Sequence, residues 1–242
     1  MILTKSGGIL GPIASVLGII MDVLFKITGQ IGIFNVGLCI ILFTLLAAGC
    51  KQPQSLPRQI TPPPSTFTTG DLAFRLGRTL QSSLIASSAD DSMRYSHVGV
   101  ILFRNDSCLV VHIEPKDDNL PDEIRCEPIE DFFSAQAAAS GCVMRHDSLT
   151  TTQQDRVAAN AIELLNSRIL FDHDYLLSDT EEMYCTELVE SIFSSVGISL
   201  SQGRRHTLPL VAEPLILPSD IAQNDALTNV WRFSYSDLRP AR

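Results

Sequence analysis

The sequence predicts an α+β domain in which an antiparallel sheet packs against helices, preceded by an apolar N-terminal segment. Three observations support this fold class. Residues 95–114 contain two runs rich in β-branched side chains around a turn, residues 151–169 and 184–196 show helical apolar spacing, and residues 9–48 are almost free of charge. Because one hydrophobic core usually organises about 100–200 residues, we expect one folded domain in this chain of 242 residues.

The apolar front contains two runs, Ile9–Phe25 and Ile31–Ala48, each near the length that crosses a bilayer. The second run leads into Ala47-Ala48-Gly49-Cys50, which resembles the lipobox of bacterial lipoproteins, where the cysteine is lipidated. We therefore expect residues 1–50 to be a signal or membrane segment with Cys50 as its lipidation site. The alternative for Cys50 is an incidental thiol at the end of a transmembrane helix. A separate choice stays open for the first run: it is a genuine extra span, or the true start is Met21, which gives a signal of conventional size.

The segment from 51 to 69 differs in composition from both of its neighbours. It is rich in Gln, Ser and Thr and contains five prolines: Pro53, Pro57, Pro62, Pro63 and Pro64. Such segments stay extended and do not bury a core, so we expect a linker here and a folded domain over residues 70–242.

The strands are predicted from short runs that alternate or are rich in β-branched residues. Asn105 and Asp106 supply turn chemistry between two of these runs, which makes an antiparallel hairpin the simplest interpretation. Residues 115–126 are polar and irregular. The expected strands are Asp71–Leu76, Tyr95–Phe103, Cys108–Glu114, Cys142–Arg145 and Asn229–Phe233, with a helical turn at Pro128–Phe133.

Two amphipathic helices complete the prediction. The first begins at a capping box formed by Thr151 to Gln154, and its apolar residues recur at helical spacing as far as Ile169. The second covers about Tyr184–Val196 and ends at Gly197. Each helix should pack one face on the sheet.

Cys185 lies in the first turn of the second predicted helix. There, unpaired backbone N–H groups and the helix dipole favour an anion, which would stabilise a thiolate and offer an oxyanion hole. A nucleophilic cysteine also needs a histidine base and a third polar group that orients the histidine. His97, at the start of the clearest strand, is the candidate base, and Gly99 leaves room beside it.

His112 and Glu114 are rival candidates for the third group, because they face the same side of the next strand. If Asn105 and Asp106 form the centre of the turn, Glu114 lies opposite His97. His112 then lies diagonally, roughly 7–8 Å away by Cα. That register favours Glu114, but hairpin geometry alone does not decide between the two.

Five motifs in order resemble those of the permuted papain-like amidases of the YaeF/YiiX type, within the NlpC superfamily. They are Gly70-Asp71-Leu72, Tyr95-Ser96-His97-Val98-Gly99-Val100, Phe171-Asp172-His173-Asp174-Tyr175, Tyr184-Cys185-Thr186-Glu187-Leu188-Val189 and Leu217-Pro218-Ser219-Asp220-Ile221. The resemblance covers most of residues 70–233 and implies a circularly permuted papain-like fold, in which the histidine precedes the cysteine. It also implies that Cys185 is the nucleophile and His97 the general base, and its spacing favours His112 over Glu114 as the third group.

Two possible metal sites were weighed. His173 lies between Asp172 and Asp174, and Cys185, His97 and His112 form a trio that zinc accepts in principle. The sequence lacks a close-spaced ligand pair such as C-x-x-C or H-E-x-x-H, and a solvated loop is the simpler interpretation of His173. We expect no metal and no cofactor.

The remaining cysteines of the domain, Cys108, Cys126 and Cys142, allow one disulfide in an oxidising compartment or three free thiols. The sequence does not favour either state.

Composition excludes one class of partner. The formal net charge is -9, and the only basic cluster is Arg204-Arg205-His206, so nucleic acid is not an expected partner. The resemblance implies a cysteine-dependent amidase or peptidase that works through an acyl-enzyme, and the front of the chain predicts a membrane-anchored enzyme of the cell envelope, with its domain in the periplasm or outside the cell. Cell-wall peptides or related amides are the expected substrates. The alternatives are a thioesterase, lipase or acyltransferase with the same pair, and a tethered binding module without catalysis.

Overall fold

The structure is a computed structural model that describes residues 59–88, 94–115, 122–179, 181–209 and 211–238. The predicted signal or membrane segment, including Cys50, and the first part of the predicted linker lie outside these residues. Within the described ranges, no helix combines the length and apolar character needed to cross a bilayer.

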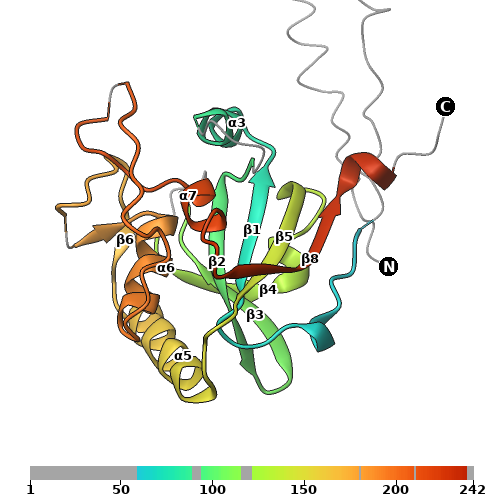
Figure 1. The fold of residues 1–242 in the computed structure, drawn as a ribbon. Helices are drawn as coiled ribbons and strands as arrows, with labels where there is room; N and C mark the ends of the chain where they lie inside the picture. Colours follow the sequence, from blue (N-terminus) through green and yellow to red (C-terminus); the bar gives the residue numbers. More distant parts are fainter. Residues whose placement is uncertain (1–58, 89–93, 116–121, 180, 210, 239–242) are drawn as a thin grey trace, which may run out of the picture. The chain divides into compact units, whose positions relative to one another are not determined.

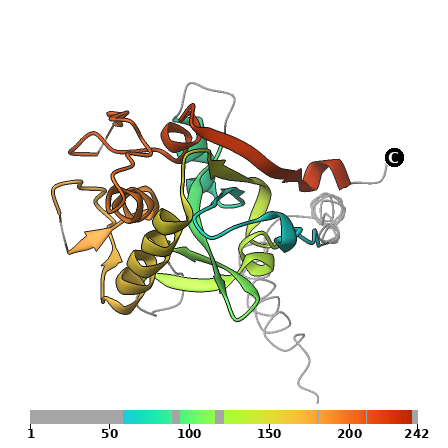
Figure 2. The same cartoon turned by 60° about the horizontal axis from the view of Figure 1, so that its bottom comes forward.

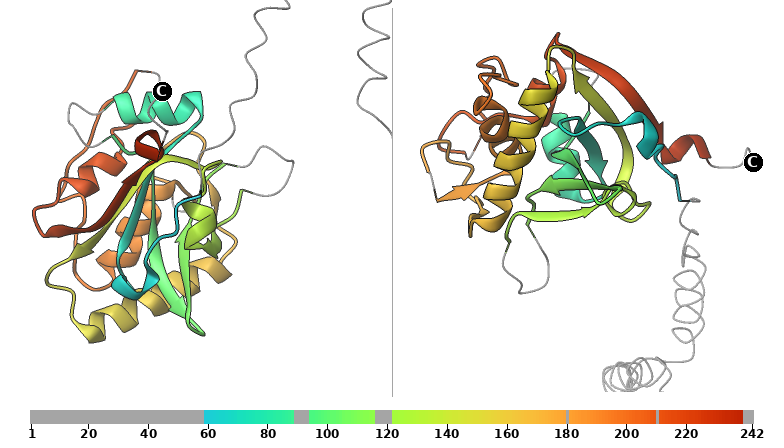
Figure 3. Two further views of the ribbon diagram at one scale, coloured as in Figure 1. Left: turned by 90° about the vertical axis from the view of Figure 1, so that its right-hand side faces the viewer. Right: turned by 90° about the horizontal axis from the view of Figure 1, so that it is seen from below.

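A six-stranded antiparallel sheet forms the centre of the domain, with the strand order β4-β3-β2-β1-β5-β8 (Figure 1). Figure 3 shows that the sheet is strongly curved. Its strands are β1 Leu72–Gly77, β2 His97–Arg104, β3 Ser107–His112, β4 Arg125–Pro128, β5 Ala138–His146 and β8 Leu227–Ser234.

The hairpin between β2 and β3 follows the predicted register. Asn105 and Asp106 adopt left-handed φ angles of 49° and 61°, as a tight two-residue hairpin turn requires. The paired residues run from Arg104 opposite Ser107 to Val100 opposite Val111. Continued by one residue, this register places Gly99 opposite His112.

Helices α5 (Thr151–Asn166) and α6 (Cys185–Ser194) lie side by side on one side of the sheet (Figures 2 and 3). Val98 and Val100 of β2 share a buried cluster with Leu188 and Ile192 of α6, because alternate residues of the strand face the helices. The other face of the sheet packs on a second cluster, which contains Phe132 of α4 (Ile129–Phe132). The predicted α+β architecture of sheet against helices is confirmed.

The start of α5 differs by one residue from the prediction. The capping box joins Thr150 and Gln153, not Thr151 and Gln154, because Thr150 is the residue with extended backbone before the first turn. The end of α6 is as expected, since Gly197 follows it with a left-handed φ of 77°.

The sequence did not predict several short elements. A polar stretch forms helix α3, and β4 begins within the segment interpreted as irregular, residues 115–126. These elements are η1 Pro64–Thr66, α3 Leu80–Ser87, β4, the parallel pair β6 Leu170–Phe171 and β7 Glu182–Met183, α7 Pro218–Ala222 and η2 Tyr235–Leu238.

The described end of the predicted linker packs on the domain. The side chain of Gln59 donates to the carbonyl of Glu130 and accepts from the backbone N–H of Ala135. Phe67 is buried and meets the ring of Trp231 edge to face, at 5.9 Å between centroids. The packed domain therefore begins before Gly70.

Candidate active site

Cys185 is the first residue of α6, and the start of this helix is fixed by its neighbours. Glu187 accepts a hydrogen bond from the backbone N–H of Tyr184 at 3.1 Å. The Tyr184 hydroxyl accepts from the backbone N–H of Ile216 at 3.0 Å, and the Thr186 hydroxyl donates to the Ile216 carbonyl at 2.9 Å. We call residues 184–187 the helix start.

Burial dominates the chemistry of the Cys185 thiol. It raises the pKa of Cys185 to about 11, while hydrogen bonds from the backbone N–H groups of Val98 and Thr186 and the charge of Arg75 oppose this rise. The expectation that the helix position stabilises the thiolate is therefore only partly right. The N–H groups act in the predicted direction, but the loss of hydration outweighs them. At neutral pH the thiol keeps its proton, so a base must remove it.

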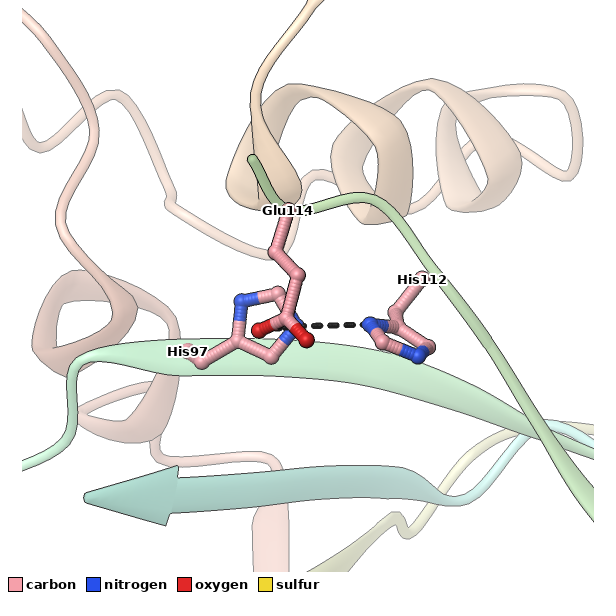
Figure 4. Close-up of side chains that lie close together, drawn as sticks. All are labelled: His97, His112 and Glu114. Atoms are coloured by element: carbon pink, nitrogen blue, oxygen red, sulfur yellow. Dashed lines mark hydrogen bonds and ion pairs between the residues drawn. The ribbon is translucent and has the colours of Figure 1, made fainter. Parts of the chain in front are cut away.

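His97 and His112 are brought together by the hairpin. Nε2 of His97 lies 2.8 Å from Nδ1 of His112, and Figure 4 shows the two rings directed at each other from neighbouring strands. Both side chains are buried, and both rings pack against Phe132. Hydrogen bonding and packing together fix the orientation of the His97 ring.

Gly99 explains why the diagonal histidine, and not the opposite glutamate, reaches His97. A Cβ atom at Gly99 would lie only 2.9 Å from the Cβ of His112 and 2.8 Å from the carbonyl oxygen of Val111. Without a side chain at this position, His112 can approach β2 closely and lean toward His97. Glu114 Oε2 lies farther away, 3.7 Å from His97 Nε2.

Glu114 is held by two arginines. One of its carboxylate oxygens pairs with Arg75 of β1 and the other with Arg125 of β4. Arg75 also donates to the carbonyl of Phe132 at 2.9 Å, and burial lowers the pKa of this guanidinium to about 10.

Glu127 of β4 completes the group on the far side of His112. Its Oε1 lies 3.0 Å from His112 Nε2, and Arg125 Nε donates to the same nitrogen at 3.3 Å. We call the whole group the sheet network: Arg75, His97, His112, Glu114, Arg125 and Glu127.

The sheet network keeps both histidines neutral. Burial, with the charges of Arg75 and Arg125, holds the pKa of His97 and of His112 well below 6.5. At neutral pH each ring therefore carries one proton and one lone pair, and His97 is available as a base.

Cys185 and His97 line one cavity of about 280 Å³. Tyr175, on its rim, adopts a left-handed φ of 58° and is held there because the buried Asp172 carboxylate accepts backbone N–H groups from residues 174–176 at 2.5–2.8 Å. The other lining residues are Arg75, Gly77, Arg78, Thr79, Gln81, Ser82, Ile85, Ser96, Glu114, Pro115, Gln136, Ala137, Phe171 and Tyr184.

The structure arranges the residues of the two candidate metal sites differently. His173 is exposed and pairs with Asp122 at 2.9 Å, while Asp172 is occupied by backbone N–H groups. In the described part of the chain, one group of three potential ligands comes together, and it consists of His97, His112 and Glu114 without Cys185. This group fits a cation poorly, because both oxygens of Glu114 are paired with guanidinium groups that would repel a second positive charge.

The sequence did not identify Arg75, Arg125 or Glu127 as parts of the site. A signal was present for Arg75, since it alternates with Ala73 along β1 and so lies on a face packed in the core. Arg125 and Glu127 share one face of β4, a strand of four residues that was not predicted, and its first half lies in the segment interpreted as irregular, residues 115–126. Cys108, Cys126 and Cys142 are free thiols.

The fold and the order of the site residues define a class: papain-like proteins with a permuted chain, in which a strand carrying the histidine precedes the helix that begins with the cysteine. A family model described as permuted papain-like amidase enzyme, YaeF/YiiX, C92 family, matches residues 66–231. The chain belongs to this family, as the sequence motifs indicated.

One solved structure supports the same fold. The crystal structure of the metalloprotein yiiX from Escherichia coli O157:H7 is 21% identical, with a TM-score of 0.56 over 69% of this chain and 98% of that chain. At this identity the likeness concerns the fold. A search of curated proteins gave no match.

Proposed function

We propose that the protein is a cysteine-dependent amidase or peptidase in which Cys185 is the nucleophile, His97 the general base and His112 the residue that orients His97. Membership in an amidase family supports the reaction class. The observation that carries the proposal is the shared cavity of Cys185 and His97, with His97 neutral and bonded through Nε2 to His112.

The proposed reaction runs through an acyl-enzyme at Cys185. His97 Nδ1, the ring nitrogen not bonded to His112, takes the thiol proton, and the Cys185 sulfur attacks the amide carbonyl. Backbone N–H groups at the helix start stabilise the oxyanion. The His97 proton then passes to the leaving amine, and the acyl group stays on sulfur as a thioester. A water molecule, deprotonated by His97, hydrolyses the thioester and regenerates the thiol.

The cavity offers both polar and apolar contacts to a short substrate. Arg78, Gln81 and Gln136 offer hydrogen bonds, and Tyr175 and Phe171 offer aromatic faces. A volume of about 280 Å³ is small for a binding pocket and suits one or two residues of a peptide. Cell-wall peptides are therefore the first substrates to test, in an enzyme anchored in the cell envelope through Cys50.

The test compares Cys185→Ala with Cys126→Ala in the full chain, purified in detergent. Cys126 is also a free thiol, but it lies on β4 and does not line the cavity. We expect Cys185→Ala to abolish both hydrolysis of a wall-derived peptide and labelling by a thiol-reactive substrate analogue, and Cys126→Ala to keep both. Normal turnover by Cys185→Ala would refute the proposal.

A second candidate, an esterase or acyltransferase with the same residues, is favoured by one observation. Leu80 and Leu84 of α3 are 78% and 61% exposed, and Ile85 of the same helix lines the cavity. Such a surface can accept an acyl chain. Matched substrates that differ only in an amide or ester bond, each with a short and a long acyl group, distinguish the two. A preference for the long acyl ester that Leu84→Ser reduces would favour the second candidate.

A further inference from the structure

Glu127 stands beyond His112, at the end of the chain of groups that leads away from the cavity. Its side chain is 25% exposed, and its Oε1 lies 3.0 Å from Nε2 of the fully buried His112. Glu127 makes no hydrogen bond to Cys185 or to His97, so it takes no direct part in the proposed reaction. Any effect it has on the chemistry passes through its neighbours His112 and Arg75.

The proton count of the reaction defines what His112 has to do. When His97 has taken the thiol proton, both of its ring nitrogens carry hydrogen, so its Nε2–H can only donate. His112 Nδ1, at 2.8 Å, must then accept. A neutral His112 that accepts at Nδ1 carries its own proton on Nε2, and this proton needs an acceptor.

Two groups face His112 Nε2, and they favour opposite tautomers. Arg125 Nε donates to this nitrogen at 3.3 Å, which requires a lone pair on Nε2 and places the His112 proton on Nδ1. Glu127 is the carboxylate within reach of Nε2, and it favours a proton on Nε2. Only the second tautomer is compatible with a protonated His97.

We propose that Glu127 is a positioning residue that stabilises the Nε2–H tautomer of His112 and thereby supports His97 in its protonated state. This inference extends the proposed function, and the part of it that concerns catalysis rests on that function. The negative charge also offsets the guanidinium of Arg75, whose Nη1 lies 3.8 Å from Glu127 Oε1 and which opposes protonation of both histidines. Glu114 does not supply this effect to His112 Nε2, because its two oxygens are paired with Arg75 and Arg125.

The kinetic arm of the test uses Glu127→Gln in the full chain, with Glu130→Gln as the matched control. Glu130 is an exposed carboxylate three residues away that does not belong to the sheet network. A glutamine amide can donate to His112 Nε2 as well as accept from it. The substitution therefore keeps the shape of the side chain but no longer selects the Nε2–H tautomer of His112. We expect kcat to fall about 10–100-fold with KM unchanged. This is less than the roughly 10⁴-fold loss in serine proteases whose triad aspartate is replaced, because Glu127 acts on His97 through the ring of His112.

The second arm measures the tautomer directly, in protein that also carries Cys185→Ala. Ring ¹⁵N shifts of His112 should show less protonation at Nε2 in Glu127→Gln than in its parent, with no change in Glu130→Gln. Unchanged His112 shifts, or unchanged kcat in Glu127→Gln, would overturn the inference. If Cys185→Ala still hydrolyses the substrate while the shifts move, the proposed function fails and the tautomer assignment stands.

Discussion

The two parts of the site, the sheet network and the helix start, depend on different groups. The sheet network consists of side chains from strands β1 to β4, together with Glu114, which lies two residues beyond the end of β3. The pKa of the Cys185 thiol is set mainly by burial and by backbone N–H groups, one from Val98 on β2 and others from the helix start, with a further effect of the Arg75 charge. We therefore expect single substitutions to affect His97, the proposed base, more strongly than they affect the thiol.

The largest effect is expected from His97→Gln, which removes the proposed base from the sheet network. A glutamine cannot accept the thiol proton, so kcat/KM should fall about 10²–10⁴-fold. The control is His173→Gln, because His173 is 63% exposed on its side chain and bonds to Asp122. Turnover in a peptide assay is the measurement. Equal losses in the two variants would show that His97 has no special role.

The second largest effect is expected from Gly99→Ala, which displaces His112 by steric overlap without removing any functional group. The added methyl group would meet the Cβ of His112 at 2.9 Å and the carbonyl oxygen of Val111 at 2.8 Å. Overpacking of this kind costs about 1–3 kcal/mol of unfolding free energy, and a displaced His112 should lower kcat about 10²-fold.

Gly197→Ala provides the control for stability. Gly197 has a φ of 77°, and a Cβ there would contact nothing within 4 Å. Alanine in this conformation should cost about 1 kcal/mol of stability without changing kcat. If both variants lose activity in proportion to stability, the close approach of His112 to Gly99 does not matter for catalysis.

The pH dependence of stability tests the sheet network as a whole. Because the pKa of His97 and of His112 is lowered by folding, the unfolded chain binds protons near pH 6.5 that the folded protein does not. Stability from these groups is present above pH 6.5 and is lost as the pH falls below it, by about 1.4 kcal/mol per pH unit for each net proton.

Glu187 opposes this trend. Burial raises its pKa to about 7, so it contributes stability below pH 4.5 that is lost as the pH rises through 7. Since two histidines act against one glutamate, urea unfolding should show a lower free energy at pH 5.5 than at pH 7.5. The difference should shrink in His112→Gln and grow in Glu187→Gln. A protein that is more stable at pH 5.5 would contradict the assignment of neutral histidines.

The smallest effect is expected at the helix start, from Glu187→Gln at pH 8. The glutamine oxygen can still accept from the Tyr184 N–H, and burial and the backbone continue to set the pKa of Cys185. The rate of Cys185 alkylation should change less than about threefold, which corresponds to half a pKa unit. A larger change would mean that side chains control the thiol as they control the base.

Local sequence signals predicted the parts of the fold that depend on nearby residues. Helices α5 and α6 follow from apolar periodicity, and the β2–β3 hairpin follows from Asn105 and Asp106. The hairpin register was also predictable, but it pointed to Glu114 because it describes where the backbone pairs and not where side chains lean. The space at Gly99 decides this, and that space is visible only in three dimensions.

The charged partners of the histidines were not predicted, for a related reason. Arg75, Arg125 and Glu127 lie on strands far apart in the sequence, and β4 is too short to give a clear alternating pattern. Charged residues on short strands normally indicate solvent exposure. Here they are needed inside the domain, since among the described residues every buried side-chain nitrogen and oxygen has a hydrogen-bond partner.

Phe132 joins the sheet network to the hydrophobic core. Its ring contacts both His97 and His112, and the guanidinium of Arg75 lies 4.4 Å above its centroid. It also packs edge to face on Phe133 in the cluster that fills this side of the sheet. The network and the core therefore form one cooperative unit, so during denaturation the reactive arrangement of the histidines should disappear together with the tertiary packing and not before it.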